Sequence, residues 1–159
     1  SYSSLSAFKF TSTNGVTPSI GEKITQTLGS GLKAVGYVAS FDAETKVMKY
    51  IQDRSLYFGN STDQTDYVGI STQGQVLAFE SSTNQVSAPS GFSGSIETTF
   101  SLGITTVGSK NVGLGVTFTK GLATPEINKG SGDIIYIDNR ATITRNSRQK
   151  EDVKIILEF

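Results

Sequence analysis

The sequence contains neither cysteine nor histidine in its 159 residues. Without cysteine, the chain can form neither a disulfide nor a thiolate metal site. Histidine is the commonest general base and metal ligand, so its absence removes both roles. Ser–His–Asp and Cys–His catalysis is therefore excluded within this chain. We expect a protein that is not an enzyme and that holds no cofactor, metal or small-molecule substrate.

The sequence also carries no net charge, because 14 basic side chains balance 14 acidic ones. Proteins that bind nucleic acid or anionic membranes through electrostatics carry a basic excess. No apolar run approaches the roughly 20 residues that cross a bilayer. We therefore expect neither nucleic acid nor membrane among the partners. The chain begins at Ser1, which we interpret as the start of a fragment of a longer protein.

The abundant residues favour β-structure. Glycine occurs 17 times, and serine and threonine are frequent, which is typical of strands joined by turns. Val35, Tyr37, Ala39 and Phe41 form one apolar face with a period of two. Similar patterns predict strands at 7–11, 21–28, 35–41, 46–51, 67–70, 75–79, 96–102, 114–118, 134–137 and 153–159.

Two stretches bear on helix content. Residues 42–45 are typical of a hairpin loop, although a helix over 44–57 is a competing interpretation. The β-branched and aromatic side chains around this loop favour the hairpin. Thr124 and Pro125 suit the N-cap and first position of a short helical turn that ends before Gly130.

These patterns predict an all-β fold, an antiparallel small barrel or sandwich, at most divided into two β-modules, with at most a helical turn near Thr124. We expect a small β-module at 1–60, a polar connection at 61–74 and a β-domain at 75–159. The segment 96–102 is expected to pair with 114–118 across a glycine-rich loop at 103–113.

Two other functions stay open on the residues alone. A carbohydrate- or receptor-binding β-sandwich needs an exposed aromatic platform, for which the candidates are Tyr37, Tyr50, Tyr57 and Tyr67. A hydrolase needs two facing carboxylates, for which the candidate pairs are Glu80 with Glu97 and Glu22 with Asp42.

A group of arginines and polar residues near the end of the chain is the candidate interaction site. Acidic residues alternate with these arginines, a pattern that indicates structural ion pairs or a protein interface rather than a track for phosphates. The candidate residues are Asp138, Asn139, Arg140, Arg145 and Arg148.

The end of the sequence resembles a known family. Residues 131–140 read Ser-Gly-Asp-Ile-Ile-Tyr-Ile-Asp-Asn-Arg, followed by Gln149, the acidic pair at 151–152 and an apolar strand that closes on Phe159. This order resembles the C-terminus of the baseplate wedge protein made by gene eight of T-even-type contractile-tailed phages. Members of that family are about twice as long, so the chain is similar to a C-terminal half of such a protein or to a divergent short relative.

The resemblance implies a structural, non-enzymatic part of the virion. It implies a β-rich protein that forms a homodimer and is held against other baseplate wedge proteins. It also implies assembly in the host cytoplasm and a final location in the tail baseplate. The balanced charge and the absence of catalytic motifs agree with such a role.

We predict that Arg140→Ala lowers stability or assembly more than Lys110→Ala does. Arg140 lies between two expected strands, whereas Lys110 lies in the expected loop at 103–113. Thermal melting and partner binding of both variants measure the effect. Equal and negligible changes for the two variants would contradict the prediction.

Overall fold

The structure is a computed structural model that describes residues 3–52 and 76–127. The chain divides into two compact units, Ser1–Lys129 and Gly130–Phe159, and all described residues belong to the first. The predicted strands at 67–70, 134–137 and 153–159 and the connection at 61–74 lie outside the described residues.

The described residues form nine antiparallel strands, which confirm the all-β prediction. They are β1 (Ser6–Thr13), β2 (Lys23–Thr27), β3 (Lys33–Asp42), β4 (Val47–Ile51), β5 (Val86–Ser87), β6 (Ser93–Ile96), β7 (Ile104–Val107), β8 (Lys110–Gly113) and β9 (Leu122–Ala123). None of the described residues forms a helix, and so none forms a helix able to span a bilayer.

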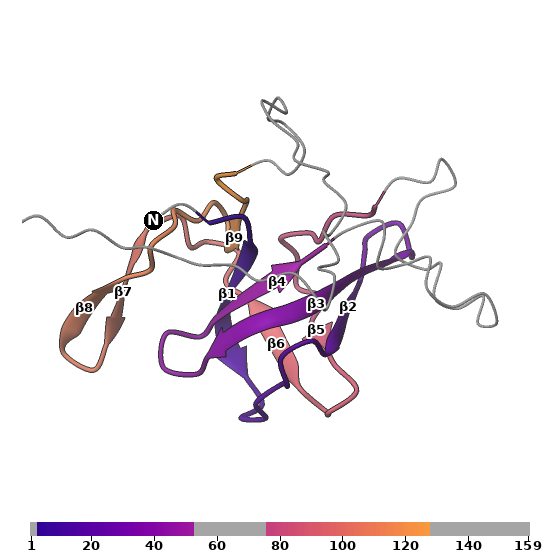
Figure 1. The fold of residues 1–159 in the computed structure, drawn as a ribbon, viewed down its shortest axis with the longest axis horizontal. Coiled ribbons are helices and arrows are strands. Elements are labelled where there is room, and N and C mark those ends of the chain that lie inside the picture. Colours follow the sequence, from indigo (N-terminus) through magenta and orange to yellow (C-terminus); the bar gives the residue numbers. More distant parts are fainter. Residues whose placement is uncertain (1–2, 53–75, 128–159) are drawn as a thin grey trace, which may run out of the picture. The chain divides into compact units, whose positions relative to one another are not determined.

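Six of the strands close into a barrel, which resolves the choice between barrel and sandwich (Figure 1). The order around the barrel is β1-β4-β3-β2-β5-β6, and β6 returns to β1. The consecutive strands β2, β3 and β4 with β1 beside β4 form a Greek key. Strands β1 to β4 from the first half of the chain and β5, β6 and β9 from the second half thus belong to one sheet. Strands β7 and β8 form a separate two-stranded sheet.

Strand β1 pairs with three other strands. Its first half, Ser6 to Lys9, pairs with β4 on one edge. On the other edge, Ala7 and Phe8 pair with β9, and the second half pairs with β6. An irregularity between Phe10 and Ser12 shifts the register there. A bulge increases local bending and twist, which suits the closure of a small barrel.

The first half of the chain follows the sequence prediction. Strands β1 to β4 form where alternation predicted them, and residues 43–46 connect β3 to β4. The Asp42 carboxylate accepts hydrogen bonds from the Glu44 and Thr45 amides, which fixes the turn. The competing helix over 44–57 is wrong in its described part, because β4 pairs there with both β1 and β3.

The second half corrects several predictions. Within the predicted strand 75–79, the described residues 76–79 form only a bridge at Val76. The residues between the predicted strands 75–79 and 96–102 contain β5 and the start of β6, and β6 ends at Ile96. A Cβ at Gly94 would lie 2.8 Å from the Phe10 ring, so this strand needs glycine where it crosses the core. That requirement makes its sequence, Ser-Gly-Ser-Ile, typical of a loop.

The predicted pair 96–102 and 114–118 is also wrong as a pair of strands. Backbone hydrogen bonds join Leu114 N to Gly103 O and Phe118 N to Leu102 O, so the segments do run side by side. The regular strands are β7 and β8, inside the expected loop, joined by the two-residue turn at Gly108 and Ser109. Gly108 has a φ of 60°, the conformation that such hairpin turns require.

No helical turn forms at Thr124 within the described residues, which end at Ile127. The Glu126 and Ile127 amides both donate to Ser3 O. These long-range bonds hold the segment against the beginning of the chain in a non-helical conformation.

Aromatic side chains fill the barrel. Phe8 and Phe10 are fully buried, and Phe8 stacks on Tyr50 with 4.1 Å between ring centroids. Phe79 meets Phe8 edge-on at 4.9 Å, and Phe92 meets Phe10 at 5.7 Å. Edge-on and offset contacts are the favoured geometries of aromatic pairs.

A second, smaller hydrophobic cluster covers part of the outside of the barrel. It consists of Ala7, Val47, Val116, Phe118 and Ala123, with Phe100 and Leu114 packed against it. Ala7 and Val47 come from β1 and β4, and the other members come from residues 100–123. Both faces of β1 are therefore covered, and its residues Ala7 to Phe10 are all buried.

Gln26 connects the barrel to the segment before β5. This side chain is 1% exposed, and its Nε2 donates to Glu80 O at 2.9 Å and Asn84 O at 3.0 Å. Its Oε1 accepts from Glu80 N at 2.8 Å. A short non-strand segment is thus held against β2 by the Gln26 amide, together with Asn84, whose Nδ2 donates to Thr27 O at 2.7 Å.

We predict that Gln26→Ala lowers the free energy of unfolding by about 2–3 kcal/mol, because it leaves partly buried backbone groups without partners. Gln85→Ala is the matched control, since Gln85 is exposed and bonds only the hydroxyls of Ser93 and Ser95. We expect the control to change stability by less than about 0.5 kcal/mol. Urea unfolding curves measure both, and equal losses would contradict the prediction.

Candidate binding site

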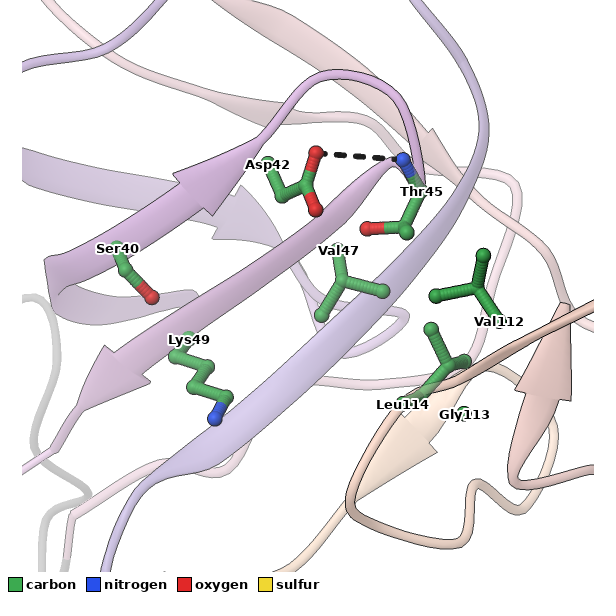
Figure 2. Close-up of a pocket in the computed structure, with 8 residues that line it drawn as sticks. All are labelled: Ser40, Asp42, Thr45, Val47, Lys49, Val112, Gly113 and Leu114. Carbon is green, nitrogen blue, oxygen red and sulfur yellow. Dashed lines mark hydrogen bonds between the residues drawn. The ribbon is translucent and has the colours of Figure 1, made fainter. Parts of the chain in front are cut away.

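A pocket of about 200 Å³ lies between the β3–β4 hairpin and β8. One wall consists of Ser40, Asp42, Thr45, Val47 and Lys49, and the other of Val112, Gly113 and Leu114 (Figure 2). The pocket therefore lies between the outer surface of the barrel and the two-stranded sheet.

Strand alternation builds the first wall. Ser40 and Asp42 are two residues apart on β3, and Val47 and Lys49 are two residues apart on β4. The register pairs Ser40 with Lys49 and Asp42 with Val47. Because side chains two residues apart share one face of a sheet, all four project outward from the barrel.

The second wall is apolar. Val112 precedes Gly113 in the sequence and Leu114 follows it. Leu114 packs against the second hydrophobic cluster. Figure 2 shows both side chains directed towards Val47 from the β8 side. Val47 is 6% exposed and so forms a buried apolar floor.

Two opposite charges line the polar side of the pocket without pairing with each other. The Asp42 carboxylate uses Oδ1 for the Glu44 and Thr45 amides. Among the described residues, neither Asp42 Oδ2 nor Lys49 Nζ has a hydrogen bond, and no ion pair joins them. The pocket thus offers a carboxylate, an ammonium and the hydroxyls of Ser40 and Thr45 beside apolar side chains.

The carboxylates considered for hydrolysis each have their own local partners. Glu80 Oε2 accepts from Gly29 N at 3.0 Å, and Glu97 Oε2 pairs with Lys9 Nζ at 3.2 Å. Glu22 accepts from the Ser19 amide at 2.9 Å and the Ser90 amide at 2.6 Å. These bonds give the carboxylates structural roles in turns and strand contacts.

Among the described residues, Lys9 is the charged side chain that is buried. Its side chain is 8% exposed, and its Nζ lies 3.2 Å from Glu97 Oε2 and 5.3 Å from the centre of the Phe100 ring. Nζ also donates to Phe10 O at 3.3 Å. The carboxylate, the ring and the carbonyl together compensate for the desolvation of the ammonium.

The candidate residues chosen from the sequence lie outside the described residues. These are Asp138, Asn139, Arg140, Arg145 and Arg148. Within the described ranges, no group of three or more acidic side chains gathers as a metal site would require. Lys110 is described, and it is the first residue of β8 rather than part of a loop.

Sequence reasoning missed the pocket. Its first wall could have been found from the alternation of Ser40 with Asp42 and of Val47 with Lys49 on two strands predicted to pair. Its second wall depends on β8, which sequence reasoning assigned to a loop. The juxtaposition of the two walls follows from tertiary packing of Leu114 and carries no local sequence signal.

No protein-family model, curated protein or solved structure matches this chain. The strand pairing of this chain therefore describes the fold, and the geometry of its pocket describes the site, without help from a relative.

Glu22 supplies a pH-dependent prediction. The Ser19 amide lowers the pKa of Glu22 below its ordinary value of 4.5, desolvation opposes this, and the Ser90 amide and hydroxyl add to the lowering. Because the pKa is lower in the folded state, the contribution to stability is complete above about 4.5 and is lost as the pH falls through the lowered pKa.

We predict that Glu22→Gln lowers the melting temperature at neutral pH and that its difference from the unchanged protein shrinks as the pH falls through that range. Glu44→Gln is the control, because Glu44 is an exposed residue of the β3–β4 loop. Thermal melting across an acidic pH series measures the difference. A Glu22→Gln difference that stays constant with pH would contradict the prediction.

Proposed function

We propose that this chain is a structural subunit that acts through contacts with other proteins, as a wedge component of a phage tail baseplate. The assignment to a baseplate rests on the resemblance of residues 131–159. The observation in the fold that supports a contact role is the filled barrel interior. Phe8, Phe10 and Phe92 occupy it with at most 1% exposure, which leaves the outer surface for binding.

The outer surface includes exposed apolar side chains of the kind used in contacts. Leu102 is 61% exposed and Ile104 is 56% exposed, and they lie two residues apart at the start of β7. Ile104 pairs with Gly113, which has no side chain to cover it. Neighbouring exposed apolar residues on a polar surface are a common feature of protein interfaces.

The carbohydrate-binding alternative gains no support from the described tyrosines. Tyr50 is 5% exposed and stacks on Phe8 in the core, so it cannot form a sugar platform. Tyr37 is half-buried on β3, and Tyr57 and Tyr67 lie outside the described residues. We therefore develop the structural role alone.

The test is assembly with wedge proteins encoded by the same genome. We expect the purified chain to form a stoichiometric complex with at least one of them, detected by size-exclusion chromatography with light scattering. The double variant Leu102→Lys with Ile104→Lys should weaken that complex by about tenfold or more, as loss of a central apolar contact does.

Ile20→Lys is the matched control, because Ile20 is 80% exposed on a separate loop. We expect this variant to bind as the unchanged chain does. A chain that stays monomeric alone and with every wedge protein would overturn the proposed function.

A further inference from the structure

Asn14 and Gly15 begin the connection between β1 and β2, and both are exposed. The connection lies beside the turn between β5 and β6, which contains Gly91 (Figure 1). Asn14 N donates to Ser93 O at 3.0 Å, and Asn14 Oδ1 accepts from Ser93 N at 3.1 Å. This side-chain oxygen takes the place of a main-chain carbonyl, so Asn14 extends the pairing of β1 with β6 by one residue beyond Thr13.

The side-chain amide of Asn14 makes two more hydrogen bonds. Its Nδ2 donates to Gly91 O at 2.6 Å, and its Oδ1 also accepts from Val16 N at 3.4 Å. The amides of Val16 and Ser93 therefore donate to the same oxygen. Donors placed in this way stabilise the negative charge that develops on a carbonyl oxygen when a nucleophile attacks its carbon. These two amides thus favour attack at Asn14 Cγ.

The main-chain nitrogen of Gly15 is the nucleophile that can reach this carbon. Its attack on Asn14 Cγ closes a five-membered ring, and the reaction is intramolecular because the two residues are adjacent. Among the described residues, the Gly15 amide donates no hydrogen bond, and a Cβ at Gly15 would meet nothing within 4 Å. Glycine also has no side chain to hinder the approach. The nitrogen is therefore open to solvent and free to react.

We propose that Asn14 is a site of non-enzymatic deamidation and that this modification weakens the closure of the barrel. Hydroxide removes the proton from Gly15 N, which bonds to Asn14 Cγ and pushes an electron pair onto Oδ1. The pair returns and expels Nδ2, which takes a proton from water and leaves as ammonia. Water then opens the succinimide at either carbonyl and gives aspartate or isoaspartate at position 14. One water is consumed and one ammonia is released, with no change of oxidation state.

Both products change the contact with the turn between β5 and β6. An aspartate has no donor for Gly91 O, and a carboxylate oxygen would replace the Nδ2 that now lies 2.6 Å from that carbonyl oxygen. Isoaspartate adds a methylene group to the main chain, which displaces the amide that now donates to Ser93 O. Because the pairing of β1 with β6 closes the barrel, either product weakens this closure.

The chemistry is tested by keeping the full 159-residue chain in mildly alkaline buffer and following its digest by liquid chromatography with mass spectrometry. Asn14 should convert to aspartate and isoaspartate, whereas Asn84 and Asn111 should stay intact because residues with side chains follow them. We expect the native chain to react about twofold to tenfold faster at Asn14 than the chain unfolded in guanidinium chloride, the effect of one hydrogen bond near the surface. An intact Asn14 in the native chain overturns the site, and a slower native rate overturns the role of the two amides. Aspartate without isoaspartate overturns ring closure.

The consequence for the barrel is tested by Asn14→Asp, which reproduces one product directly. The loss of the bond to Gly91 O should lower the melting temperature by about 2–4 °C. Asn111→Asp is the matched control, because Asn111 is exposed and its Oδ1 accepts from Thr106 Oγ1 at 3.1 Å, a bond that a carboxylate also accepts. This control should melt as the unchanged chain does. Equal melting of Asn14→Asp and the unchanged chain overturns the effect on barrel closure. The reaction needs no partner, so its outcome is independent of assembly with wedge proteins.

Discussion

The rest of the structure depends on the pairing of β1 along both of its edges. Lys9 is where these pairings meet: its amide donates to Gly121 O, and its carbonyl accepts from Glu97 N. Its ammonium then pairs with the Glu97 side chain. One residue thus connects the barrel to both ends of the 97–121 segment. Removing Glu97 would leave a buried ammonium unpaired, which is costlier than losing an exposed ion pair.

This arrangement explains why the pocket exists. The 97–121 segment is fixed near its ends by Lys9, and its middle part forms the β7–β8 hairpin. Leu114 fixes the base of that hairpin against the second hydrophobic cluster. Residues 110–112 of β8 are not part of that cluster. The outward face of β3 and β4 therefore keeps its polar residues beside Val112 and Leu114 rather than beneath a continuous core.

The first half of the fold could be predicted because its signals are local. Strands β2 to β4 are five to ten residues long, and a turn that Asp42 stabilises joins β3 to β4. The second half could not, because its strands are two to four residues long, and β5, β6 and β9 pair with strands from the first half of the chain. The alternation of β1 predicts one exposed face, yet Lys9 is buried because residues 97–121 cover that face. Such coverage has no signature in the strand itself.

Close backbone approach explains why the covering segment has this sequence. Gly121 has a φ of 78°, and a Cβ there would lie 2.6 Å from Glu97 O. The Gly121 carbonyl is the one that accepts from Lys9, and its amide donates to Phe100 O. A side chain at 121 would separate the segment from both β1 and residues 97–100, and the Lys9–Glu97 pair would lose its cover from water. The glycine content that makes this region look like a loop is therefore what allows it to pack as a layer on the barrel.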